Sequence, residues 1–144
     1  MTTTPDVEED VLQRLATLAP SVLDVAGSDR NAWSGPVRPS EQSGIPQRAF
    51  FVQASGNGQS AIHSGGKLRT IECIVTCRSA PQQYEQVRSD AFAIYDAADL
   101  TGAFTGASGK VYHEMRCLGV APQYEGTDGN AEYFSVVVEV HTDG

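Results

Sequence analysis

Three cysteines and three histidines are the side chains of this sequence best suited to act as nucleophiles, bases or metal ligands. Cys73 and Cys77 stand four residues apart in a segment that alternates like a β-strand, as do His113 and Cys117. Four strand residues span roughly 13 Å, which is too far for a shared metal ion or a nucleophile–base contact. The metal-binding spacings H-x-x-x-H and C-x-x-C are also absent. We therefore expect no catalytic, cofactor or metal site, and we interpret the cysteines as reduced, buried apolar residues.

The other two histidines give no stronger chemical signal. His63 lies in a Gly- and Ser-rich loop, and His141 lies close to Glu139 in an alternating segment. Both are interpreted as polar loop or sheet-face residues. The two glycines before Lys67 precede a strand, whereas a phosphate-binding loop should open a helix. The sequence therefore favours a protein that is not an enzyme.

Five residues are instead candidates for contact with a partner protein. Trp33 and Phe104 are aromatic residues in Gly- and Ser-rich contexts, where such side chains either anchor a partner or pack inside the chain. Arg38, Asn57 and Lys67 lie in or beside the polar loops and complete the set. We expect these five residues to mark an interface with another protein.

Length and charge narrow the class of protein. The 144 residues fit a single domain over 1–144, and the 40% share of hydrophobic residues is enough for a modest core. The net charge of −8 argues against a protein that grips nucleic acid, because phosphate binding depends on clustered Lys and Arg. The sequence shows neither an apolar run of roughly 20 residues, as a membrane span needs, nor a secretion signal at its start. We expect no membrane partner and a protein that stays in the compartment where it is made.

Two segments have the periodicity of amphipathic helices. Apolar residues recur at helical spacing within 5–18, in an N-terminal helical region expected over 1–24. A longer helix is predicted over about 81–100, with Ser79 as a reasonable cap. Between residues 25 and 47, Gly, Ser, Pro, Asn and Gln dominate without any period. That composition predicts a flexible loop, which we expect to become ordered on meeting a partner.

Strand patterns fill much of the predicted sheet-and-helix core over 48–144. The predicted strands are 45–54, 67–78, 111–118 and 133–141. A turn signal at Asp128-Gly129 predicts that the last two strands form a hairpin. Hairpins before and after one long helix predict an α+β fold: an antiparallel sheet of about four or more strands with the long helix packed on one face, plus the N-terminal helix. Such a sheet has exposed edges that are suited to self-association.

Four segments carry a resemblance to a known family. They are the run Ile-Pro-Gln-Arg-Ala-Phe-Phe-Val from Ile45, the strand that ends in Arg-Ser (Val75 to Ser79), the Ala-rich helix that ends near Leu-x-Gly (Leu100 to Gly102), and the closing Tyr-Phe-Ser-Val-Val-Val-Glu-Val (Tyr133 to Val140). In order and spacing they resemble the tail terminator, or tail-completion, proteins of long-tailed bacteriophages. The resemblance covers about residues 45–142.

The resemblance implies a structural virion protein that has no catalytic residues and no cofactor. In that family a ring, usually of six copies, caps the head-proximal end of the tail tube, stops its polymerisation and provides the surface to which the filled head attaches. The implied partners are further copies of the chain, the major tail tube protein and a head-completion or connector protein. DNA passes through the lumen without specific binding, which agrees with the net charge of −8. The implied location is the virion tail or neck, after assembly in the host bacterial cytoplasm, and the same fold serves phage-derived gene transfer particles.

Two other functions stay open at this point. A head-completion or head–tail joining protein of the neck would also be a ring-forming structural subunit. A small α+β ligand-binding or hydrolytic domain would instead need polar groups that converge in a pocket. Assembly into rings is the property that separates the structural functions from the third one.

Overall fold

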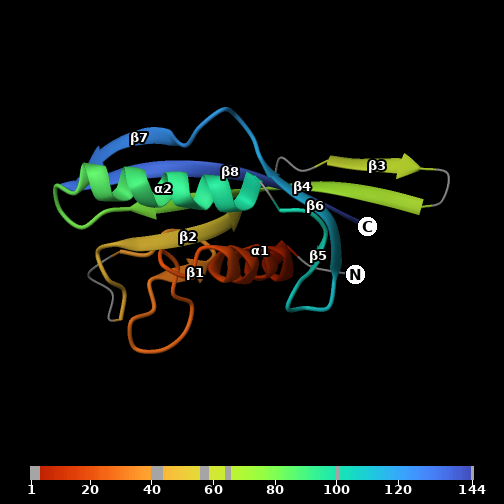
Figure 1. The fold of residues 1–144 in the computed structure, drawn as a ribbon, viewed down its shortest axis with the longest axis horizontal. Helices are drawn as coiled ribbons and strands as arrows, with labels where there is room; N and C mark the ends of the chain where they lie inside the picture. The colour runs from red at the N-terminus through yellow and green to blue at the C-terminus, as the bar shows by residue number, and fades with distance from the viewer. Residues whose placement is uncertain (1–3, 40–43, 56–58, 64–65, 100, 144) are drawn as a thin grey trace.

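The computed structural model describes residues 4–39, 44–55, 59–63, 66–99 and 101–143. Within these ranges two helices and eight strands follow one another along the chain (Figure 1). In order they are α1 (Thr4–Leu18), β1 (Ala32–Ser34), β2 (Ala49–Ala54), β3 (Gln59–His63), β4 (Gly66–Arg78), α2 (Tyr84–Asp99), β5 (Phe104–Thr105), β6 (Val111–Cys117), β7 (Gln123–Asp128) and β8 (Ala131–Asp143).

The two 13-residue strands, β4 and β8, form the centre of one eight-stranded sheet. They pair antiparallel from Leu68↔Asp143 to Arg78↔Tyr133. Shorter strands follow one another along their outer edges, with β2 and β3 on β4, and β6 and β7 on β8. β1 and β5 are the outermost strands of the order β1-β2-β4-β8-β6-β5. The β3–β4 hairpin extends beyond the two helices as an arm (Figure 1).

The predicted α+β fold is confirmed, with α1 as the N-terminal helix and α2 as the long helix. The sheet is mixed rather than wholly antiparallel, because β1 pairs parallel with β2. β1 lies inside the stretch 25–47, for which no strand was predicted. Its three residues are too few to show an alternating pattern. α2 begins at Tyr84, because Gln82 before it adopts a left-handed conformation with φ 59°.

The expected final hairpin also needs correction. β6 does pair antiparallel with β8, but the turn after Asp128 closes the hairpin of β7 with β8. Gly129 and Asn130 form that turn with φ of 57° and 77°, a left-handed pair that suits a tight hairpin. The sequence pattern missed β7 because its residues, Gln-Tyr-Glu-Gly-Thr-Asp, are exposed or half-buried and contain no alternating apolar row.

Both helices pack on the same face of the sheet. Alternate residues of β4, namely Cys73, Val75 and Cys77, point into this layer and are fully buried. Burial of this kind contributes roughly 1.5–3 kcal/mol for each large aliphatic side chain. The buried residues of the main core include Val7, Val11, Leu12 and Leu15 of α1, Val87, Ala91, Ile94 and Ala98 of α2, and Phe50, Val52, Met115, Phe134, Val136, Val138 and Val140 of the strands.

The other face of the sheet is covered at one end only. There a second, smaller cluster of buried residues consists of Trp33, Ile45, Ala49 and Phe51. Phe50 and Phe51 therefore both lie in the interior, as the apolar run around them predicted, but on opposite faces. Beyond the second cluster this face carries half-buried residues of β4 and β8, and we call it the open face.

A buried carboxylate attaches α1 to the turn between β5 and β6. Asp10 is 1% exposed and accepts hydrogen bonds from the Ser108 backbone N–H (2.9 Å), the Ser108 hydroxyl (2.6 Å) and the Tyr112 hydroxyl (2.7 Å). Three donors compensate for the water that a buried carboxylate loses. Gly106 passes so close that a Cβ added there would lie 2.6 Å from Oδ2 of Asp10 and 2.8 Å from Oδ1. The turn therefore needs glycine at this position.

The substitution Gly106→Ala should destabilise the protein by about 1–3 kcal/mol, because the added methyl group displaces a carboxylate that three donors hold in place. Gly102→Ala is the matched control, since a Cβ at Gly102 would meet no atom within 4 Å and its φ is not positive. Urea unfolding followed by circular dichroism measures both. Equal stability of the two variants would show that Asp10 does not fix this turn.

Candidate functional site

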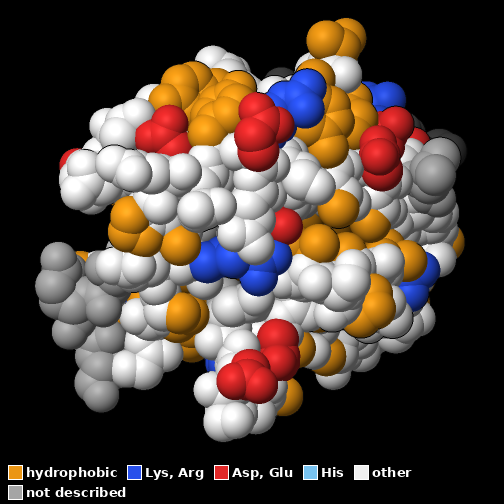
Figure 2. All heavy atoms as spheres, turned by 60° about the vertical axis from the view of Figure 1, so that its left-hand side comes forward, with side chains coloured by type: hydrophobic (Ala, Val, Ile, Leu, Met, Phe, Trp, Pro, Cys, Tyr) orange, Lys and Arg blue, Asp and Glu red, His pale blue; other side chains and the backbone are white. Residues whose placement is uncertain are grey.

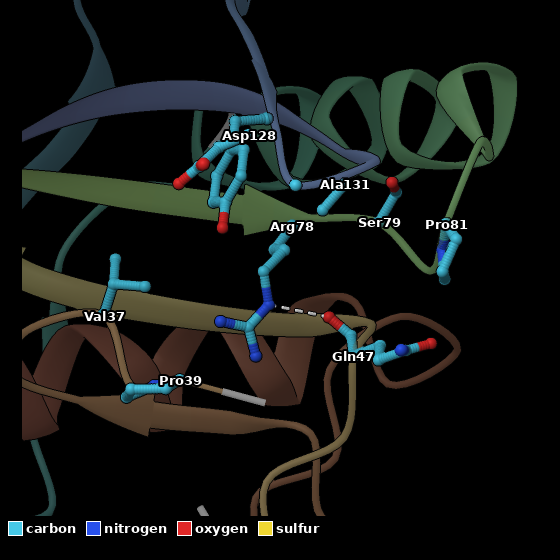
Figure 3. Close-up of a pocket in the computed structure, with 10 residues that line it drawn as sticks. Val37, Pro39, Gln47, Arg78, Ser79, Pro81, Asp128 and Ala131 are labelled. Atoms are coloured by element: carbon cyan, nitrogen blue, oxygen red, sulfur yellow. Dashed lines mark hydrogen bonds between the residues drawn. The ribbon is translucent and has the colours of Figure 1, made fainter. Parts of the chain in front are cut away.

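Arg78, the last residue of β4, organises the covered end of the open face (Figure 3). It is 4% exposed, and its guanidinium donates hydrogen bonds to the carbonyl oxygens of Gln47 (2.8 Å), Arg38 (2.6 Å) and Pro46 (2.9 Å). The guanidinium carbon also lies 5.3 Å from the centroid of the Phe51 ring. A single cation thus binds two separate parts of the predicted loop and holds them against the sheet.

Ser79, the next residue, connects the end of β4 to the start of β8. Its backbone N–H donates to the Glu132 carbonyl (2.9 Å), and its hydroxyl accepts from the Glu132 N–H (2.8 Å). Three residues after Ser79, the Gln82 N–H donates a hydrogen bond to the Asn130 carbonyl (2.9 Å). The expectation that Ser79 caps the long helix is therefore wrong, because its hydroxyl is engaged with β8 and α2 begins five residues later.

These segments enclose a cavity of about 350 Å³ (Figure 3). Two of the residues that line it, Arg78 and Asp128, carry charge. The guanidinium of Arg78 already donates hydrogen bonds to the three backbone carbonyls described above. The lining residues are Val37, Pro39, Gln47, Arg78, Ser79, Pro81, Asp128, Gly129, Ala131 and Tyr133. They include no histidine or cysteine that could serve as base or nucleophile.

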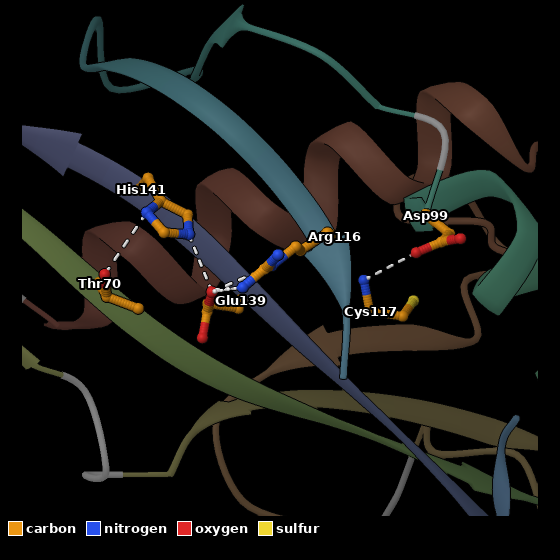
Figure 4. A network of polar contacts seen from close by, with 6 residues as sticks. All are labelled: Thr70, Asp99, Arg116, Cys117, Glu139 and His141. Carbon is orange, nitrogen blue, oxygen red and sulfur yellow. Dashed lines mark hydrogen bonds and ion pairs between the residues drawn. The ribbon is translucent and has the colours of Figure 1, made fainter. Parts of the chain in front are cut away.

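A polar network crosses the uncovered part of the open face (Figure 4). His141 Nε2 lies 2.8 Å from Glu139 Oε1, His141 Nδ1 lies 3.4 Å from the Thr70 hydroxyl, and Arg116 lies 3.2 Å from the same Glu139 oxygen. The order hydroxyl–imidazole–carboxylate resembles a hydrolytic triad, but Thr70 and His141 are directly opposite partners in the β4–β8 ladder. Their backbone groups belong to the paired β4–β8 ladder rather than to a turn or helix N-terminus whose N–H groups could form an oxyanion hole. The network is therefore best explained as cross-strand stabilisation.

The predicted partner-contact residues do not gather at one place. Trp33 on β1 is 8% exposed and stacks on Phe51 at 6.1 Å, with the Arg38 guanidinium 5.9 Å from its ring. Phe104 on β5 is also 8% exposed and stacks on Tyr112 at 4.8 Å. β1 and β5 are opposite ends of the strand order, so the two aromatic candidates lie far apart in the sheet.

Two further candidates fall outside what the structure describes. Asn57 lies outside the described residues, and so does the side chain of Lys67, whose backbone pairs with Ile62 in the β3–β4 hairpin. Arg38 is half-buried, and its guanidinium lies 3.4 Å from the Ser34 carbonyl. The interface role of all five residues stays a prediction.

The cysteines lie in the core as free thiols. Burial raises the pKa of Cys73 from 9.0 to about 12, with a smaller contribution from Glu8. Burial likewise raises the pKa of Cys117 to about 12, and Asp99 and Asp96 raise it further. For Cys77, burial is again the main cause of a strongly raised pKa. A thiol of this kind is neutral at physiological pH and is a poor nucleophile.

No group of three His, Cys, Asp or Glu side chains within the described residues is placed to hold a metal ion. Neither α1 nor α2, the helices of the described chain, has the length and apolar composition of a membrane span.

No family model and no curated protein matches the sequence. A likeness appears instead at the level of structure, to a chain in the virion of a native gene transfer agent (GTA) particle. The two structures agree with a TM-score of 0.63 over 96% of this chain and 96% of that chain, at 12% sequence identity. This chain has the fold of a gene transfer agent virion chain. The agreement includes nearly the whole of both chains, so it concerns the complete arrangement of helices and sheet.

Replacing Arg78 by lysine should lower the free energy of unfolding by roughly 2–4 kcal/mol, because one ammonium group cannot reach three carbonyl oxygens that a planar guanidinium binds. Arg88→Lys is the control, since Arg88 is exposed and packs over Phe92 on the outside of α2. Urea unfolding measures both variants. If the two unfold at the same urea concentration, the carbonyl contacts of Arg78 contribute little.

The raised cysteine pKa values predict that stability falls as the pH rises above 9. The unfolded chain releases thiol protons near pH 9.0, whereas Cys73 and Cys117 keep theirs in the folded chain until about pH 12. The stabilisation is therefore complete below pH 9 and is lost between pH 9 and 12. Urea unfolding between pH 7.5 and 10.5 should show a smaller decline for Cys73→Ala than for the unaltered chain. An identical decline would contradict the prediction.

Proposed function

We propose that this chain is a structural protein of a phage or phage-like virion, and more specifically a tail terminator. Copies of it form a ring on the head-proximal end of the tail tube, stop the tube from growing and present the surface to which the head attaches. The observation that carries the proposal is the likeness in fold, over 96% of both chains, to a chain of a gene transfer agent virion.

The sequence resemblance supports the finer assignment independently. Its Arg-Ser pair corresponds to Arg78 and Ser79, the two residues that fix the open-face loop and the start of β8. Its closing strand corresponds to most of β8, the strand that pairs with β4, β6 and β7. The features that resemble the family are thus the ones that organise the sheet.

The charge of the chain suits a channel through which DNA moves. A net charge of −8 per copy gives a ring a repulsive potential toward phosphates, and this lowers the residence time of DNA at its wall. Within the described residues, Arg30 and Arg38 lie over Trp33 and Arg78 lies over Phe51, but Arg78 is 4% exposed and engaged by three carbonyls, so this group offers two arginines to a phosphate. DNA is therefore a passing occupant rather than a ligand.

Neither alternative function has an observation of its own in its favour. A head-completion or head–tail joining protein would share the fold class and the ring, so only its binding partner separates it from a terminator. A hydrolytic domain would need a pocket with a base and a nucleophile. The 350 Å³ cavity is lined by no histidine or cysteine, and its Ser79 hydroxyl is engaged by the Glu132 N–H. In the Thr70–His141–Glu139 network, Thr70 and His141 are opposite partners in the β4–β8 ladder.

The proposal predicts that the protein binds one end of tail tubes polymerised from the major tail tube protein of the same particle. Negative-stain imaging should show a ring at that end, and tubes grown in its presence should be shorter than tubes grown alone. The molar mass of the protein in solution, measured without tubes, shows whether the ring forms before it binds a tube end. Binding to portal or head particles, but not to tube ends, would favour the head-completion function. Absence of binding to either would contradict a neck function.

A further inference from the structure

Two arginines lie over the ring of Trp33 on the edge strand β1. The guanidinium carbons of Arg30 and Arg38 are 5.2 Å and 5.9 Å from the ring centroid. Both side chains are half-buried, and neither forms an ion pair with a carboxylate among the described residues. Two like charges held at one ring repel each other, and an anionic partner would relieve that repulsion.

The guanidinium groups of these arginines still have N–H groups to offer. Arg30 donates through Nε to the Ala32 carbonyl oxygen (2.9 Å), and its two Nη groups have no partner within the described chain. Arg38 places Nη2 3.4 Å from the Ser34 carbonyl oxygen. Their unpartnered nitrogens reach solvent, because Nε of Arg14 is the one side-chain N or O atom of the described, half-buried or buried residues that is both enclosed and unpartnered. Carboxylate oxygens from outside can therefore approach both groups.

The edge of β1 favours such a side-chain contact over the addition of another strand. β1 pairs with β2 through alternate residues, so the backbone groups of Ala32 and Ser34 face outward. Arg30 and Arg38 lie against these two outward carbonyls. Positive charge on an edge strand also discourages pairing with a further strand. We call this edge, with Arg30, Trp33 and Arg38, the arginine edge.

The exposed carboxylates lie mainly on the other side of the sheet. Seven Asp and Glu residues of the described chain are exposed, and one of them, Asp29, precedes Arg30. The other six belong to α2, β6 and β7, and we call their surface the acidic side: Glu85, Asp96, Asp99, Glu114, Glu125 and Asp128. The central strands β4 and β8 separate β1 from β6 and β7, and α2 packs on β8 and β6. In Figure 1, β1 lies toward the bottom of the molecule and β7 toward the top.

The left-hand side of Figure 1, turned forward in Figure 2, shows part of this distribution. Asp and Glu side chains gather in the upper part of the view, the height at which β7 lies in Figure 1, with small groups of Lys and Arg among them. The largest group of Lys and Arg side chains lies lower, near the centre, with an acidic group below it. Grouped charges of opposite sign suit a contact between unlike surfaces of two molecules.

We propose that the arginine edge binds the acidic side of a second copy of this chain. The net charge of −8 makes the chain's own surface a suitable partner for a pair of cations, and it disfavours the phosphates of DNA. A contact between two different surfaces joins copies head to tail, and such contacts close into a ring when the rotation permits. This inference rests on the self-assembly that the proposed function requires, and it adds the surfaces through which the copies meet.

The test is the self-association of purified full-length protein, measured by sedimentation equilibrium at low and high salt. The double variant R30Q/R38Q should weaken association by at least about tenfold, and added salt should weaken association of the unaltered chain. Arg88→Gln is the matched control, because Arg88 also lies over an aromatic ring, that of Phe92 at 4.8 Å, but is exposed on α2. It should leave association undiminished. Thermal unfolding verifies that each variant is folded.

A mixing experiment tests whether the contact joins unlike surfaces. The variant E85Q/D96N/E114Q/E125Q/D128N neutralises the acidic side and keeps Asp99, which lies 3.3 Å from the Cys117 backbone nitrogen. This variant and R30Q/R38Q should each associate weakly with themselves. An equimolar mixture of the two should form 1:1 dimers with the affinity of the unaltered chain, because each variant supplies the surface that the other lacks.

The outcomes separate this inference from the proposed function. Weak self-association of both variants, with dimers in their mixture, supports the contact, whereas a mixture without dimers overturns it. Association that is unchanged in folded R30Q/R38Q also overturns it, while the tail-tube experiment still decides the neck function. The same holds for an unaltered chain that stays monomeric at every concentration. Binding of duplex DNA that R30Q/R38Q abolishes, with self-association unchanged, would assign the arginines to phosphate and overturn the contact between copies.

Discussion

The buried guanidinium of Arg78 is the interaction on which the open face of the sheet depends. Burying a cation is costly, and here the backbone carbonyls of residues 38, 46 and 47, together with the Phe51 ring, compensate for the lost water. The same contacts hold residues 38 and 46–47 over the sheet, beside the second cluster that contains Trp33 and Ile45. Without a cation at the end of β4, a polar segment of this composition would have few reasons to fold back onto the sheet.

Buried charged side chains also attach each of the two helices to a neighbouring strand or turn. Asp10 attaches α1 to the β5–β6 turn, and Asp90 attaches α2 to the start of β2 through a two-pronged ion pair with Arg48 at 2.9 Å. Each of these carboxylates is less than a tenth exposed and is fully engaged. The apolar core sets the two-layer arrangement, whereas these polar contacts fix where each helix and loop lies on it.

Periodicity predicted the elements that have a buried side and missed those that do not. The alternation of Cys73, Val75 and Cys77 predicted β4, and helical spacing predicted α1 and α2. β7 was missed because its side chains are exposed. β1 was missed because it has only three residues and pairs with β2, a strand further along the chain. The contact of Arg14 with the Phe104 ring was missed for a similar reason, since Phe104 lies on a strand of two residues. Contacts between distant segments leave no local pattern in a sequence.

The structural role that we propose agrees with the way in which the chain uses its charged side chains. Several acidic and basic side chains of the described residues form cross-strand pairs or attach a helix or loop to the sheet. A catalytic group needs an unengaged atom inside a pocket, whereas an assembly contact needs an unengaged group at the surface. The buried carboxylates of Asp10 and Asp90 and the buried guanidinium of Arg78 are already engaged, each by two or more hydrogen bonds. These three groups therefore stabilise the fold, and they are not available to a substrate.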